Sequence, residues 1–566
     1  MTTPTTSGGP GRPYALLLLC FLLVYILPLG QRPLFEPDET RYAEIPREMA
    51  DGGNWLELRL AGLRYYEKPP LGYWLGAASI SLFGHHPLAA RLPAALAAGA
   101  SALAIFLMLR AHRSDPSKAL GAAVIYLSFV QVFGIGTFAT LDSLFSFFVT
   151  LSLCAFFLAT ESPPGLPRMA RLLLAGSSCA AAFLTKGFTA LAIPMLSLAI
   201  WLPWQRLLGK HLVSCLTTLL FAILAALPTA LVLHTHNPEF WNYFFWVEHV
   251  QRFLGPSGGQ HKEPFWYYLP VLAAGALPWT FFLPYASKRI LDKIRTRDSL
   301  SRYCLTWFVI PLLFFSACGG KIATYILPCF APLAILLTEA IFDAPTDFSR
   351  AAKTCALFFC ALVPATIVFG PLFLDNPLLL EELKRDPRTW LAATGIILAA
   401  AGFYQAASHL RASSSRLAAL ARYALPCLLL FLVPFYGLPS IIIQRKSPSV
   451  LLEEAVSLTP PEAFILTDRP SLVASSWHYR RNDLIFALGR GELAYGLQWP
   501  EAQGRCLGSE TEVMELIHEQ MESGRPVAVV MDHYSRMSRI LTPFLDRLNP
   551  ARILQQGDFS WRLYLP

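Results

Sequence analysis

Apolar residues gather in uninterrupted runs over the first 440 or so positions of the chain, and short polar segments separate the runs. The runs are about 17 to 23 residues long, and a helix of that length spans the ~30 Å hydrocarbon core of a bilayer. They are apolar on every side, whereas a surface helix of a soluble protein carries a single apolar stripe. The pattern therefore predicts an α-helical polytopic membrane protein with about 13 transmembrane helices.

The expected spans can be placed by their hydropathy, and composition agrees with them: 54% of the 566 residues are hydrophobic and 15% are charged. The stretch 71–84 is apolar but short and follows Pro69-Pro70, so we expect it to lie at the membrane interface or to re-enter. The expected spans are 14–29, 88–109, 119–137, 142–160, 171–184, 188–203, 211–233, 266–286, 303–317, 322–341, 353–374, 389–408 and 417–438.

Lysine and arginine concentrate in alternate loops between these spans, as in 110–118, 206–210 and 288–302. The positive-inside rule then places those loops and the N-terminus in the cytoplasm. The first polar loop, 31–87, which we expect to carry juxtamembrane helices, and the large loop 234–265 then face outward. The net charge of +8 lies in the membrane loops and does not indicate a nucleic-acid partner.

The composition changes near Gln444. Short β-rich runs at 463–466 and 527–531 alternate with a helical stretch at 510–522, which predicts a small C-terminal α/β soluble domain. We therefore divide the chain into a transmembrane domain, 1–440, and an α/β domain, 441–566, which the odd number of spans places on the outer side. No Gly-rich phosphate loop or Walker pattern is present, so no nucleotide is expected as a cofactor.

The first outward loop carries the densest group of charges, beginning with Pro37-Asp38-Glu39-Thr40-Arg41-Tyr42. In a helix, Asp38 shares a face with Arg41 or Tyr42. A carboxylate beside a cation suits a site that handles a phosphate together with a charged reacting group. The alternative is a solvated ion pair at the interface, which is common and needs no function.

Further candidates lie in the same loop and at the ends of later spans. Two prolines after Glu67-Lys68 hold that pair close to the membrane surface, where Lys68 can bind a lipid phosphate or snorkel to headgroups. Asp142 closes a short outward turn, where a helix N-cap explains an aspartate equally well. Lys186 is an isolated cation at an outer helix end and carries the same ambiguity.

The remaining outward segments add a histidine and a second lysine–tyrosine pair. Aromatic residues alternate with charges over 241–268, which is typical of an interfacial helix and needs no function. His261 in this segment can meet Glu67 as a metal-ligand pair, although a lone histidine is more often structural. Lys321 and Tyr325 are four residues apart, so an α-helix directs both into one cavity or makes them an ordinary anchor pair.

Several of these motifs, in this order and spacing, resemble those of the bacterial lipid A 4-amino-4-deoxy-L-arabinose transferases, which belong to the same membrane glycosyltransferases as the protein O-mannosyltransferases. The resemblance covers about residues 14–440 and is weaker in the C-terminal domain. The motifs are Pro-Asp-Glu-Thr-Arg-Tyr-Ala-Glu at 37–44, Tyr-x-Glu-Lys-Pro at 65–69, Thr-Leu-Asp-Ser at 140–143, Val-Glu-His-Val-Gln-Arg-Phe at 247–253, Gln-His-Lys-x-Pro-Phe-Trp-Tyr-Tyr at 260–268 and Thr-Tyr-Ile-Leu-Pro-Cys-Phe-Ala-Pro-Leu at 324–333.

The resemblance implies a multi-pass enzyme of the bacterial inner membrane with a periplasmic active site. Such an enzyme moves the amino sugar from undecaprenyl phosphate to a lipid A phosphate, which lowers the negative charge of the cell surface and confers resistance to cationic peptides such as polymyxin. It implies that Asp38 and Asp142 are the essential acidic residues. It also implies that Arg41 and Lys68 bind the carrier phosphate and that Tyr325 lines that site.

Three further site expectations accompany these. Glu67 and His261 are implied to hold a structural or regulatory zinc ion. Tyr42 and Lys321, neighbours of the implied phosphate residues, are added as substrate-binding candidates. A phosphomonoester acceptor is mostly dianionic at neutral pH and needs no strong general base, so we expect Asp38 and Asp142 to position the sugar or the acceptor.

Transporters, receptors and scaffolds fit the sequence less well than a transferase does. A transporter or lipid flippase is expected to carry charges near mid-bilayer, whereas the charges here lie at the outer helix ends. A receptor or scaffold leaves the paired acidic and basic loops unexplained. The nearest alternative is a polyprenyl-phosphate-sugar transferase with a different sugar or acceptor, similar to a protein O-mannosyltransferase.

Overall fold

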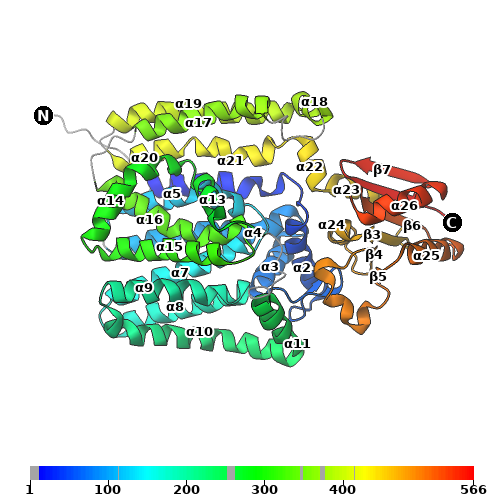
Figure 1. Cartoon of the computed structure of the whole chain (residues 1–566), viewed down its shortest axis with the longest axis horizontal. Helices are drawn as coiled ribbons and strands as arrows, with labels where there is room; N and C mark the ends of the chain where they lie inside the picture. The colour runs from blue at the N-terminus through cyan, green and yellow to red at the C-terminus, as the bar shows by residue number, and fades with distance from the viewer. Residues whose placement is uncertain (1–11, 113, 252–261, 344–348, 370–376, 413–414) are drawn as a thin grey trace.

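A bundle of long helices with an α/β domain at one end makes up the molecule (Figure 1). The computed structural model describes residues 12–566 except 113, 252–261, 344–348, 370–376 and 413–414. Two short helices, α2 (Asp38–Gly52) and α3 (Leu71–Phe83), lie between the bundle and the α/β domain. The basic helix α14 (Leu283–Arg295) lies at the opposite end of the bundle, as the positive-inside argument requires.

The helical membrane fold is confirmed. Within the described ranges, eight helices are long and apolar enough to cross a membrane, or ten if two sharply bent pairs each form one span. Three other expected spans correspond to α8 (Leu166–Lys186), α9 (Thr189–Trp204) and α17 (Ser349–Phe369), which are not among those ten. The stretch expected not to span is α3, an apolar helix of only 13 residues.

The other elements of the bundle have the following bounds: α1 (Arg12–Phe21), η1 (Leu22–Ile26), η2 (Leu27–Gly30), α4 (Pro87–Ala111), α5 (Pro116–Leu127), α6 (Val130–Gly136), α7 (Asp142–Glu161), α10 (Leu208–His236), α11 (Glu239–Trp241), η3 (Asn242–Gln251), α13 (Tyr268–Gly275), η5 (Trp279–Phe282), α15 (Ser299–Ala317), η6 (Ala323–Cys329), α16 (Phe330–Phe342), α18 (Pro377–Arg385), α19 (Pro387–Ala412), α20 (Arg416–Ala424) and α21 (Cys427–Tyr436).

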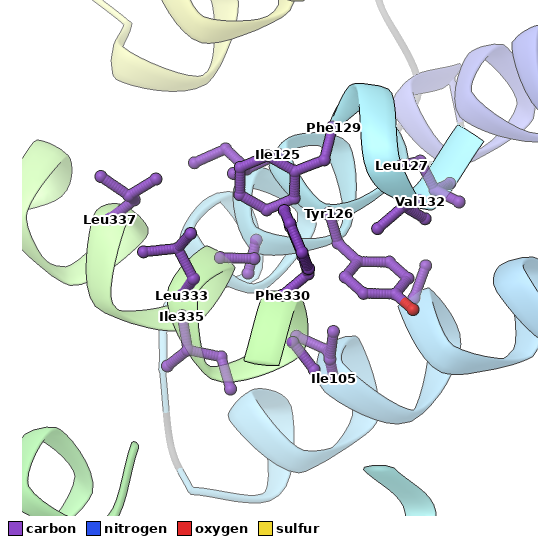
Figure 2. Close-up of a cluster of buried hydrophobic side chains, with 14 of the residues drawn as sticks. Ile105, Ile125, Tyr126, Leu127, Phe129, Val132, Phe330, Leu333, Ile335 and Leu337 are labelled. Atoms are coloured by element: carbon purple, nitrogen blue, oxygen red, sulfur yellow. The ribbon is translucent and has the colours of Figure 1, made fainter. Parts of the chain in front are cut away.

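The centre of the bundle is packed around the break between α5 and α6, where the chain bends by 65° (Figure 2). Phe129 at the break meets Phe330 of α16 edge to face, with ring centroids 5.2 Å apart. The backbone groups that the bend frees are satisfied by neighbours, since Val130 N donates to Leu277 O at 3.0 Å. The bend is therefore a fixed part of the bundle core.

The C-terminal domain is a mixed sheet in the order β5-β4-β3-β6-β8-β7, and the predicted α/β domain is confirmed. The expected β-rich runs are β3 (Phe464–Asp468) and β6 (Val527–Asp532), and the expected helix is α25 (Glu510–Glu522). The other elements are α22 (Ser440–Lys446), α23 (Ser449–Leu458), α24 (Arg469–Tyr479), β4 (Ile485–Ala487), η8 (Gly491–Leu493), η9 (Gly496–Gln498), η10 (Pro500–Ala502), β5 (Cys506–Leu507), α26 (Arg536–Arg547), β7 (Arg552–Gln556) and β8 (Phe559–Tyr564).

The C-terminal domain packs on the first polar loop of the membrane domain. Arg64, in the hairpin of β1 (Arg59–Leu60) and β2 (Leu63–Arg64), pairs with Glu501 at 2.6 Å and lies 3.8 Å over the ring of Trp499. At Gly62 the backbone has φ +81°, and an added Cβ would lie 2.3 Å from Asn482 O, so only glycine fits this close approach. The contact brings the C-terminal domain directly over the predicted site.

Candidate active site

The start of α2 is fixed by Glu39, which is completely buried between two arginines. Arg91 of α4 donates to both carboxylate oxygens, at 2.7 and 2.8 Å, and Arg32 donates to them as well. Burial by itself would raise the pKa of Glu39, but Arg91 and Arg32 outweigh it and hold the pKa at about 2. We call Glu39, Arg32 and Arg91 the Glu39 cluster.

The Glu39 cluster also joins separate segments of the backbone. The Glu39 carboxylate accepts hydrogen bonds from Phe35 N and Ala139 N, both at 3.0 Å. Arg91 donates to Leu29 O at 2.6 Å, at the end of the first span. The first span, α2, α4 and the turn before α7 are therefore tied at one point, and the neighbouring residue Asp38 takes its position from it.

Asp38 and Arg41 lie on one face of α2 and form an ion pair, as their spacing predicts. The guanidinium has a second carboxylate partner, Glu492 of η8 in the C-terminal domain. Asp38 is 52% exposed, Arg41 15% and Glu492 18%. We call Asp38, Arg41 and Glu492 the Arg41 cluster; it is a charged group at the surface of the bundle end, covered by the second domain.

Tyrosine rings line the space beside the Arg41 cluster. The Arg41 guanidinium lies 5.2 Å over the ring of Tyr42, and Tyr42 stacks on Tyr73 of α3 with centroids 6.1 Å apart. Burial raises the pKa of Tyr42, and the carboxylates of Asp142 and Glu67 contribute to the rise. Tyr42 is thus a common neighbour of residues from three segments of the chain.

Asp142 and Lys186 form the second charged pair of the site. Asp142 is the first residue of α7, and its carboxylate pairs with Lys186 at the end of α8. The N-cap of α7 is Leu141, so Asp142 lies inside the first turn of the helix and is not its N-cap. The Lys186 ammonium lies 4.7 Å over the ring of Tyr325, which brings that tyrosine into the same group.

Glu67 and Lys68 precede α3 and are both half-buried. The Lys68 ammonium donates to Glu67 O at 3.1 Å. Burial raises the pKa of both Tyr65 and Tyr73, and the nearby Glu67 carboxylate adds to the rise. The structure therefore brings Glu67 and Lys68 to the same region as the Arg41 cluster.

Lys321 and Tyr325 make different contacts in this structure. The Lys321 ammonium donates to Cys318 O at 2.7 Å and to Glu263 O at 2.9 Å, and the side chain is buried. The expected i,i+4 geometry is absent because Lys321 precedes η6, a 3-10 helix with about three residues per turn. Lys321 therefore links the segment at Glu263 to the end of α15, and Tyr325 faces Lys186.

Of the two residues expected to hold zinc, Glu67 is described and His261 lies outside the described residues. Among the residues that are described, no group of three or more histidine, cysteine, aspartate or glutamate side chains can hold a metal ion. Glu67 has tyrosines as its described neighbours. A zinc ion held by Glu67 and His261 therefore stays a prediction.

Nothing in the sequence pointed to Glu492 or related the candidate Lys186 to Asp142. Glu492 is 451 positions from Arg41 in the sequence, and Lys186 is 44 positions from Asp142, so no local spacing relates them. The buried role of Glu39 was missed too, although an arginine inside the apolar run that forms α4 is a signal, because such a charge needs a partner.

Two parts of the chain match known protein families. Residues 13–244 match the dolichyl-phosphate-mannose-protein mannosyltransferase family, and residues 443–559 match the C-terminal domain of the arabinosyl transferase ArnT. The undecaprenyl phosphate-alpha-4-amino-4-deoxy-L-arabinose arabinosyl transferase of Shewanella sediminis is 37% identical over 86% of this chain and 88% of its own length. The protein of the same name from Erwinia tasmaniensis is 38% identical over 87% and 89%.

Solved structures share the fold. The crystal structure of ArnT from Cupriavidus metallidurans bound to undecaprenyl phosphate superposes with a TM-score of 0.83, covers 98% of each chain and is 22% identical in sequence. The apo structure of the same protein gives the same TM-score. The fold is therefore shared along nearly the whole chain, and the relatives that are 37% and 38% identical confirm the resemblance found in the sequence motifs.

Proposed function

The chain belongs to the family of undecaprenyl phosphate-α-4-amino-4-deoxy-L-arabinose arabinosyl transferases, and we propose that it transfers the amino sugar from its undecaprenyl phosphate carrier to a lipid A phosphate. As a member it is a glycosyltransferase that uses an undecaprenyl-phosphate-linked sugar. It is a multi-pass protein of the bacterial inner membrane. The observation that carries the proposal is a pair of ion pairs, Asp38–Arg41 and Asp142–Lys186, with Tyr42 as a common neighbour of Asp38, Arg41 and Asp142.

Transfer requires no net movement of a proton. An oxygen of the acceptor phosphate attacks C1 of the sugar, and the bond between C1 and the carrier phosphate oxygen breaks. The carrier phosphate leaves with the electron pair and gains one negative charge, while the acceptor phosphate loses one. The catalytic demand is therefore to stabilise charge that develops on the carrier.

Arg41 and Lys68 meet that demand in this proposal. A guanidinium binds phosphate through two parallel N–H donors, and Arg41 has a buried Nε without a partner in the described part of the chain. Lys68 adds a point charge held at the membrane surface by the two prolines after it. Tyr42 and Tyr325 line the space between the charged pairs.

Asp38 and Asp142 position the sugar. Each carboxylate already holds a cation, Arg41 and Lys186 respectively, so each site accepts a positive group. The 4-ammonium group of the sugar carries such a charge. An acceptor hydroxyl, as in protein mannosylation, would need a base, whereas a dianionic phosphate does not.

The active site and the C-terminal domain face the periplasm in this proposal. The basic helix α14 at the opposite end of the bundle supports that orientation. A structural or regulatory zinc ion held by Glu67 and His261 is part of the proposal. Metal analysis of purified protein should find zinc that is lost in both Glu67→Gln and His261→Ala.

Mass spectrometry of lipid A tests the function. Cells that express the protein should show lipid A heavier by one aminopentose, and cells that express Arg41→Ala at equal membrane level should not. A lipid A profile that is the same with and without the unsubstituted protein overturns the proposal. A normal shift with Arg41→Ala overturns only the assignment of Arg41.

A further inference from the structure

Glu492 is the one described carboxylate of the C-terminal domain that reaches Arg41, and it stands on a segment anchored to the membrane domain. Leu493 beside it is buried. Tyr495 packs against Tyr66 at 5.5 Å and against Tyr243 at 4.1 Å between ring centroids. The short turns η8 and η9 therefore hold Glu492 against Arg41 from the side of the C-terminal domain.

The Arg41 guanidinium is shared between two different anions in this structure. One terminal nitrogen donates to Glu492 and the other to Asp38, while Nε is buried and has no partner within the described ranges. Carboxylate and phosphate compete for the same forked donors of an arginine. With both carboxylates in place, a phosphate that pairs with Nε and a terminal nitrogen of Arg41 has to lie directly beside a carboxylate that is already bound to that nitrogen.

We propose that Glu492 occupies on Arg41 the position taken by the carrier phosphate, so that carrier binding and the Arg41–Glu492 contact exclude each other. This rests on the proposed function, since it takes Arg41 as the residue that binds the carrier phosphate. The C-terminal domain then acts as a latch: Glu492 holds Arg41 in the empty site, and the arriving phosphate releases the segment 488–502.

When the carrier phosphate binds, Glu492 releases Arg41, whereas Asp38 remains paired with it. Asp38 is three residues from Arg41 on the same helix, whose start the Glu39 cluster fixes. Glu492 belongs to another domain and to a segment of short turns. Retaining both carboxylates beside an incoming phosphate would place three anions around one guanidinium, and like charges at that distance repel.

The coupling is reciprocal. If the phosphate weakens the Glu492 contact, the Glu492 contact weakens phosphate binding by the same factor. Removing the charge of Glu492 without changing its shape should therefore tighten carrier binding. A residue that only held Arg41 in a productive position would have the opposite effect.

The test measures binding of undecaprenyl phosphate to the purified full chain in detergent, by the change in intrinsic tryptophan fluorescence. Glu492→Gln should lower the Kd about tenfold, which is the size of one charge-assisted hydrogen bond at a part-buried site. Glu501→Gln is the matched control, because Glu501 pairs with Arg64 at the same domain interface but not with Arg41. Its Kd should be unchanged.

Hydrogen exchange of the peptide 488–502 gives a readout that needs no variant. Undecaprenyl phosphate should speed exchange in this peptide in the unsubstituted protein. In Glu492→Gln the exchange should be fast already and should not respond to the ligand. Slower exchange on binding in the unsubstituted protein, or a Kd of Glu492→Gln that is unchanged or higher, overturns the latch.

Arg41→Ala separates failure of the latch from failure of the proposed function. If Arg41→Ala loses carrier binding and Glu492→Gln has no effect, only the latch is wrong. If Arg41→Ala binds undecaprenyl phosphate normally, the phosphate role of Arg41 is wrong and the latch falls with it.

Discussion

Asp38 and Glu39 are neighbours in the sequence, and their carboxylates lie in very different surroundings. Glu39 is 0% exposed and bound by two arginines, whereas Asp38 is 52% exposed and shares one arginine with another domain. Successive residues of a helix point about 100° apart, so Glu39 turns into the bundle and Asp38 turns toward the surface beside Arg41. The Glu39 cluster ties the first span, α2 and α4 together, whereas the Arg41 cluster has a carboxylate at the surface.

The largest loss of stability is expected from a substitution of Glu39. Glu39→Gln leaves Arg32 and Arg91 buried with uncompensated charge, so we expect a loss of about 3–5 kcal/mol in the free energy of unfolding. Thermal unfolding in detergent, with the carrier absent, measures it. An unchanged melting temperature would show that the Glu39 cluster does not fix the fold.

Acidification should weaken the same cluster without a substitution. The pKa of Glu39 is about 2 in the folded protein, below its ordinary value of 4.5, so the folded state holds this proton less tightly than the unfolded state. The stabilisation is complete above about pH 4.5 and is lost as the pH falls toward 2, by about 3 kcal/mol in all.

Melting curves from pH 6 down to pH 3 measure this loss. In Glu39→Gln the part of the slope that Glu39 contributes should be missing. A slope equal in the two proteins would assign the acid sensitivity to other carboxylates.

The smallest effect on stability is expected at Asp38. Because its pair with Arg41 is half exposed, Asp38→Asn should change stability by less than about 1 kcal/mol. Sugar transfer should fall about 100-fold, since the carboxylate that positions the substrate is lost.

Asp51→Asn is the matched control for Asp38→Asn. Asp51 also lies on α2, is 54% exposed and pairs with an arginine, Arg47, four residues earlier. It should leave transfer unchanged when assayed beside Asp38→Asn. Equal losses in the two variants would mean that any charge change on α2 impairs the enzyme and that Asp38 has no special role.

Local spacing was enough for some features and failed for others. The pairing of Asp38 with Arg41 follows from helical geometry, and the strands β3 and β6 follow from their apolar, β-branched composition. The helical i,i+4 spacing of Lys321 and Tyr325 is not formed, because the chain enters a 3-10 helix after Lys321. Spacing predicts contacts only where the type of helix is known.

The sequence by itself determined the membrane class of this protein, its C-terminal α/β domain and the outer-loop residues that carry charge, because apolar run length and charge distribution are local properties of the chain. Only the tertiary structure decided which carboxylate is buried with Arg91, that Asp142 pairs with Lys186 and that Glu492 reaches Arg41. Those pairings join segments far apart in the sequence, and the packing of helices and domains alone brings their charges within reach.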